Sequence, residues 1–127
     1  MIDIETLIVT AWDAVGTLPE LWSDSIPMER WESQVFPVAV FGESRFGSER
    51  LNGGTRLVMC EFQFRVFHTD KMQAFTLGQA AVTFMEGFEA EGVYSVRVNS
   101  SATAVRTELG GLDVWYFEFR AEIKINE

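Results

Sequence analysis

The stretch EFQFRVFHTDKMQAF, residues 61–75, decides the fold, because a strand and a helix meet inside it. Before the joint, apolar and polar residues alternate with the two-residue period of a strand that has one dry face. The dry face holds Val58, Cys60, Phe62, Phe64 and Val66, and the other face holds Met59, Glu61, Gln63, Arg65 and Phe67. This pattern is typical of an antiparallel sheet that is covered by helix on one face only.

After the joint, apolar residues recur at a spacing of three and four, which predicts an amphipathic helix. Thr69 or Asp70 can cap it, and it runs to about Gly87 or Ala90. The predicted buried stripe consists of Ala74, Leu77, Ala81, Phe84 and Phe88. Gly78 and the alanines leave room for a close approach to a sheet or to a second helix.

His68, the chain's one histidine, stands at this joint. A zinc site needs further His or Cys ligands, and Cys60 is the only other candidate. The two residues lie on one predicted strand, separated by more than roughly 20 Å at about 3.3 Å per residue. We therefore predict that His68 is a structural corner residue and that Cys60, in the apolar face, is an inert thiol.

Upstream of this stretch, residues 3–15 form a predicted helix with Asp3 as its cap and Gly16 at its end. Residues 17–33 form a predicted irregular connection with a short helical turn. QVFPVAVFGE, which follows, predicts a short strand, and Pro37 favours an edge position or the strand's first pairs.

Downstream, GVYSVRVNSS predicts a strand, and ATAVRTELGG predicts a short strand or a turn-rich segment. The final run, LDVWYFEFRAEIKINE, alternates again, and its acids and bases match those of the first strand, so we expect cross-strand ion pairs. The order of elements predicts an α+β fold, a mainly antiparallel sheet of about four to five strands with two helices packed on one face. At 127 residues the chain is a predicted single domain, residues 1–127.

Residues 42–56, GESRFGSERLNGGTR, are rich in glycine and charge and poor in apolar anchors. We expect a long mobile loop or the tip of a long hairpin, and we expect it to contact a partner.

The net charge, the length of the apolar stretches and the number of cysteines limit the possible functions. A net charge of −9 argues against a protein that wraps nucleic acid, since that requires clustered Lys and Arg. The acidity fits either simple solubility or a surface that lets DNA pass without holding it. No uncharged stretch approaches the ~20 residues of a membrane span, and the acidic start MIDIETLIVTAWD is unlike a signal peptide. With a single cysteine, the chain fits a reducing compartment, and we expect a cytoplasmic origin.

Catalytic motifs are missing from the sequence: there is no GxSxG elbow, no phosphate-binding glycine loop and no calcium loop. We predict no catalytic, cofactor-binding or metal-binding residue and no cofactor. Trp12, Trp22 and Trp31 fall in the first quarter, and so many large apolar groups beside polar ones indicate self-association. Trp22 and Trp31 are accordingly candidate interface residues.

The order of these elements resembles the tail terminator and tail completion proteins of long-tailed bacteriophages. The likeness is carried by the N-terminal amphipathic helix, by FPVAVFGE, by the glycine-rich excursion, by RLVMCEFQFRVFHTDKMQA running into AFTLGQAAVTFMEGF, and by DVWYFEFRAEIKI. It covers most of the chain and lies in arrangement, without an invariant motif. The tryptophan-rich segment 19–31 departs from the pattern.

The resemblance implies a structural virion protein without enzymatic activity. Such proteins form rings, commonly hexamers, on the last ring of the tail tube, and are assembled in the host cytoplasm. The implied partners are further copies of the chain, the tail tube protein and a head–tail connector protein, with DNA passing through the lumen without specific binding and with no membrane contact. By position, the loop implies Arg45, Phe46, Glu49 and Arg50 as contact residues.

Two other functions stay open at this point. The chain could be a head-side connector ring, for which twelve copies are the usual expectation. It could instead be a small-ligand-binding or enzymatic α+β domain with a pocket lined by Phe62, Phe64, Trp115 and Phe117. A shortage of convergent polar and titratable groups argues against such a pocket.

Overall fold

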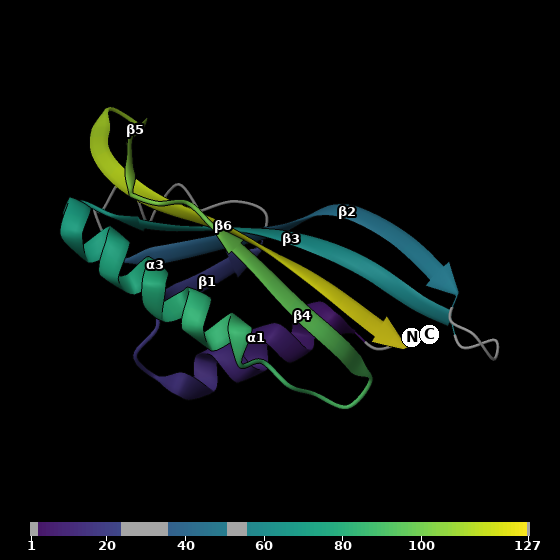
Figure 1. Cartoon of the computed structure of the whole chain (residues 1–127). Helices are drawn as coiled ribbons and strands as arrows, with labels where there is room; N and C mark the ends of the chain where they lie inside the picture. Colours follow the sequence, from purple (N-terminus) through teal and green to yellow (C-terminus); the bar gives the residue numbers. More distant parts are fainter. Residues whose placement is uncertain (1–2, 24–35, 51–55, 127) are drawn as a thin grey trace.

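The computed structural model describes residues 3–23, 36–50 and 56–126, and within residues 43–50 it describes the backbone only. In chain order the elements are α1 (Ile4–Val15), β1 (Glu20–Ser23), β2 (Val38–Arg50), β3 (Arg56–His68), α3 (Lys71–Glu86), β4 (Val93–Ser100), β5 (Val105–Leu109) and β6 (Leu112–Asn126). Figure 1 shows the strands as one curved sheet. The predicted α+β class is confirmed.

In the described part of the chain the sheet has six strands, in the order β1-β2-β3-β6-β4, and β5 also pairs with β6. Every pair is antiparallel except β1 and β2, which run parallel. The prediction of about four to five strands is therefore wrong by the short strand β1. Its four residues, ELWS, are too few to show a two-residue period, and its pairing with Val38–Phe41 of β2 depends on a segment far along the chain.

Residues 42–50, expected as part of a long loop, belong to β2, and β3 begins at Arg56. The backbone pairing continues from Gly42↔Gln63 to Arg50↔Arg56, with an irregularity between Glu43 and Arg45. Of the two expectations for 42–56, the hairpin is correct and the long loop is wrong, because ladder hydrogen bonds join backbone groups whatever the side chains are. Residues 51–55 lie outside the described part of the chain.

β3 and β6 form the centre of the sheet and pair from Leu57↔Asn126 to His68↔Trp115. The predicted alternation of β3 is confirmed: Val58, Cys60, Phe62, Phe64 and Val66 are all buried. Phe64 stacks on Phe119, the residue opposite it, with ring centroids 4.7 Å apart. Stacked rings at directly opposed positions explain how so many phenylalanines fit one layer.

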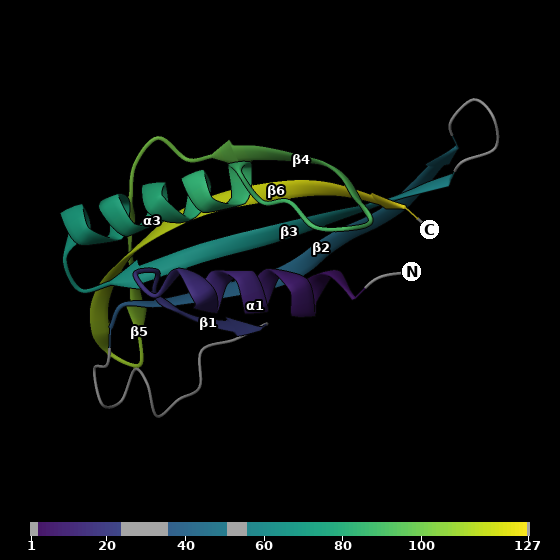
Figure 2. The ribbon, with the colours of Figure 1, turned by 90° about the horizontal axis from the view of Figure 1, so that it is seen from below.

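Both helices contact this dry face. Trp12 of α1 stacks on Phe64 at 6.1 Å, and Phe75 of α3 meets Phe117 edge-on at 5.7 Å. Trp12 also meets Phe84 of α3 at 5.5 Å, which joins the two helices. Figure 2 shows α3 lying along the β6 side of the sheet and α1 along the β2 side, both on the same side of it.

The predicted helix ends are confirmed. Asp3 caps α1, accepting the Thr6 N–H at 3.2 Å, and Gly16 ends it with a left-handed φ of 78°. Asp70 caps α3, accepting the Gln73 N–H at 3.1 Å. At the end of α1 the Trp12 indole N–H donates to the Pro19 carbonyl at 2.7 Å, which fixes the turn into β1.

A second apolar cluster lies on the opposite face of the sheet, near β5. Its buried members are Val38, Phe67 and Val114, and Tyr116 packs against it. Phe67 and Tyr116 are register partners with rings 5.7 Å apart. This cluster explains why Phe67, at the end of a strand face that is polar at Glu61, Gln63 and Arg65, is apolar.

Candidate functional site

The four predicted contact residues of the 42–56 segment, Arg45, Phe46, Glu49 and Arg50, all lie in β2. Their backbone partners on β3 are Glu61, Cys60, Leu57 and Arg56 respectively. The structure thus places these residues on the distal half of a β-hairpin, and their side chains lie outside the described part.

The two candidate tryptophans separate. Trp22 is half-buried in β1, in register with Val40 of β2. Trp31 lies outside the described residues. The structure therefore places Trp22 beside the strand that carries Arg45 and Phe46, but on the proximal half of that strand.

His68 is a corner residue, as predicted. Its Nδ1 accepts the backbone N–H of Asp70 at 3.0 Å, in the turn between β3 and α3. Cys60 is 1% exposed, within the core. Across residues 3–23, 36–42 and 56–126, no three His, Cys, Asp or Glu side chains gather in a way that could hold a metal ion.

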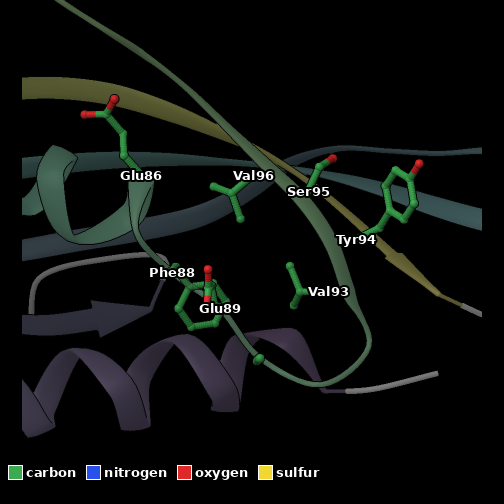
Figure 3. A pocket seen from close by; sticks show the side chains of 8 residues that line it. Glu86, Phe88, Glu89, Val93, Tyr94, Ser95 and Val96 are labelled. Carbon is green, nitrogen blue, oxygen red and sulfur yellow. The ribbon is translucent and has the colours of Figure 1, made fainter.

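A hollow of about 600 Å³ opens between the end of α3 and β4. Its lining consists of Glu86, Phe88, Glu89, Ala90, Val93, Tyr94, Ser95 and Val96. Figure 3 shows Glu86 and Tyr94 directed away from one another, at opposite ends of the group. Because its polar groups do not converge, the hollow lacks the arrangement that fixes a small ligand.

The aromatic residues that the ligand-binding alternative requires do not line this hollow. Phe62, Phe64 and Phe117 are each 0% exposed, in contact with other rings of the core. Trp115 is half-buried, with the Lys71 ammonium 5.1 Å from its ring centroid.

The face of β3 and β6 away from the helices carries a ladder of charges. Arg65 Nε lies 3.0 Å from Glu118 Oε1, which also accepts a hydrogen bond from the Gln63 amide. Arg120 lies 3.7 Å from Glu61, one step further along. The Arg65 guanidinium is also 4.9 Å from the Tyr116 ring centroid. The predicted cross-strand ion pairs are confirmed, and their exposure makes each worth about 0–1 kcal/mol.

Asp3 has a shifted pKa. The Thr6 hydroxyl donates to its carboxylate at 2.7 Å and the Thr6 N–H donates as well, which together hold the pKa of Asp3 below its ordinary value of 3.8. The cause is helix capping at an exposed position, and the shift therefore indicates no chemistry.

The sheet has an open edge at β4, which the sequence did not indicate, and another along part of β2, the strand for which Pro37 favoured an edge position. Among the strands of the described residues, β4 is the last on one side, and on the other side β1 covers β2 from Val38 to Phe41. Strand edges offer unpaired backbone donors and acceptors, so they are surfaces for further strands. The strand pattern alone could not identify them, because strand order is a property of the assembled sheet.

Neither a scan against protein-family models nor a search of curated proteins finds a match to this sequence. Of the helices in the described ranges, none combines the length and the apolar character needed to cross a membrane.

Proposed function

We propose that the chain is a structural virion protein that forms a ring at the head-proximal end of a bacteriophage tail tube, stops tube polymerisation and joins the tail to the head. The observation that carries the proposal is the arrangement of elements behind the resemblance. A capped helix, α1, precedes a long hairpin of β2 and β3. The first strand of the hairpin begins after Pro37, and the second strand turns at His68 directly into a helix.

The two faces of the sheet are consistent with a protein that acts by assembling with other subunits. One face of the sheet packs into the main core, and the other carries ion pairs of mixed charge beside the smaller apolar cluster of Val38, Phe67 and Val114. Mixed charge gives register and partner choice more than affinity.

The charge of the chain suits a passage for DNA. A hexamer at −9 per chain would carry about −54. Such a charge repels phosphates within a Debye length of ~8–10 Å at physiological salt. We propose that DNA passes through the ring without adhering to it. The proposed protein partners are the tail tube protein on one side of the ring and a connector protein on the other.

Native mass spectrometry combined with electron microscopy of the purified chain tests the proposal. We expect a closed ring of six subunits, formed alone or on addition of a phage tail tube protein. A twelve-fold ring would favour the head-side connector alternative. A strict monomer that also fails to bind the tail tube protein would contradict the proposed function.

A further inference from the structure

The outer side of β4 is an open edge of the sheet. β4 pairs with β6 from Val93↔Ile125 to Ser100↔Phe119, and no strand among the described residues covers its other side. In Figure 1 it lies at the near margin of the sheet.

The direction of its backbone groups follows from one hydrogen bond. In an antiparallel ladder, alternate residues direct both N–H and C=O to the partner strand. The Ser101 N–H donates to the Glu118 carbonyl at 3.0 Å, so Arg97 and Asn99, in phase with Ser101, bond to β6. The residues between them, Val96, Val98 and Ser100, therefore direct their backbone donors and acceptors outward.

This edge lacks the features that prevent strand addition. β4, VYSVRVNS, contains no proline and one charged residue, Arg97, and its irregularity lies only at the start, between Val93 and Ser95. The hollow adjoins it, with Phe88, Val93 and Val96 in its lining. A strand added along β4 would satisfy the outward backbone groups and would lie beside this hollow, whose lining mixes these apolar residues with polar ones.

The chain has a second edge of matching length. No strand of the described part pairs with the far side of β2 from Gly42 to Arg50. This open edge is nine residues long, and β4 is eight residues long. Three successive antiparallel pairings separate β2 from β4, so the two strands run in opposite directions within one copy.

We propose that β4 of one copy pairs with Gly42–Arg50 of β2 in the next copy, so that one sheet continues from subunit to subunit. The inference rests on the proposed function, since a ring requires two different edges that meet head to tail. A sheet that continues without turning over places these two strands antiparallel across the interface. Pairing of β4 with β4 would instead close a two-fold dimer and end the assembly.

Proline substitutions on β4 test this pairing. Val98→Pro and Ser100→Pro each remove an outward N–H and leave the bonds to β6 intact, which is the position that edge strands tolerate for proline. Val98→Thr is the matched control, because it alters the side chain and keeps the N–H. Ser100 is exposed, so its variant answers the question even if Val98→Pro fails to fold, as judged by circular dichroism.

Native mass spectrometry over a concentration series gives the main readout. We expect the proline variants to need at least about tenfold more protein for assembly than wild type or Val98→Thr. The reason is that each interface loses a backbone hydrogen bond and the close approach of the two strands. In hydrogen exchange we expect segments 42–50 and 93–100 to become protected when subunits assemble.

The outcomes separate the two proposals. If a folded proline variant assembles as wild type does, or if exchange slows only outside these segments, the strand pairing is wrong while the ring stands. A closed dimer with protection confined to 93–100 also overturns the pairing with β2. A wild-type chain that stays monomeric with and without the tail tube protein overturns the proposed function.

Discussion

Gly78 offers the sharpest test of the packing between α3 and β6. The glycine is buried on α3, and an added Cβ would lie 2.6 Å from Phe117 Cβ and closer still to two atoms of its ring. Real Cβ contacts essentially never fall under 3.0 Å. Phe117 is 0% exposed and meets Phe75, so it has no free space into which to move.

The expected effect of Gly78→Ala is a balance of two terms. Alanine favours the helix by about 1 kcal/mol over glycine. Overpacking a filled core costs about 1–3 kcal/mol, and the upper end applies because Phe117 Cβ moves only with the strand. We therefore expect a net loss of about 2 kcal/mol, or roughly 6–12 °C in melting temperature for a domain of this size.

Urea denaturation at constant temperature is the assay, with the slope of the transition checked so that the change is one of stability alone. Gly87→Ala is the matched control, because its Cβ would lie 3.7 Å from the nearest atom, the Thr83 carbonyl oxygen, an ordinary contact. We expect the control to stay within about 0.5 kcal/mol of wild type. If Gly78→Ala is neutral or stabilising, α3 does not lie against Phe117 as described.

Three further outcomes follow from the described contacts. Trp12→Phe should cost about 1–3 kcal/mol, measured by urea denaturation, because it leaves the Pro19 carbonyl without its 2.7 Å donor; an unchanged stability would contradict that bond. The pKa of Asp3 is lowered by its bonds from Thr6, so its stabilisation is complete above pH 3.8 and is lost as the pH falls through the lower folded pKa. The difference in melting temperature between wild type and Asp3→Asn should therefore narrow between about pH 5 and pH 2, and a constant gap would refute the linkage. Glu118→Gln should cost about 0.5–1 kcal/mol in low salt and less near 1 M salt, where the Debye length is ~3 Å; equal losses at both would exclude an electrostatic origin.

Elements with a strong local period were predictable from the sequence. α1, β3, α3 and β6 each show their apolar residues at the spacing of their final structure, and the caps Asp3 and Asp70 stand directly before the helices. These signals are local, since side-chain period and capping depend on residues within a few positions of one another.

The features that escaped prediction depend on distant parts of the chain. β1 exists because β2 supplies a parallel partner, and the choice between loop and hairpin for residues 42–50, which the sequence left open, is decided by their pairing with β3. The second cluster brings Val38, Phe67 and Val114 together from three strands. None of these is visible in a short window, because pairing and strand order arise only in the assembled sheet.

The candidate site divides in the same way. The corner role of His68 and the burial of Cys60 followed from the alternation of one strand. Pro37 favoured an edge position for β2, but the open edge of β4 could be identified only from the strand order, which no local motif indicates. For the same reason the sequence left open whether the predicted contact residue Arg45 lies in a loop or in a hairpin, and its backbone is paired with Glu61.

The subunit number can be read from native mass spectrometry of the intact chain, with and without a phage tail tube protein. If the chain acts by forming a ring, we expect a discrete species of six subunits and no intermediate that persists at high concentration. A single subunit mass under every condition, with no complex formed with the tube protein, would contradict it.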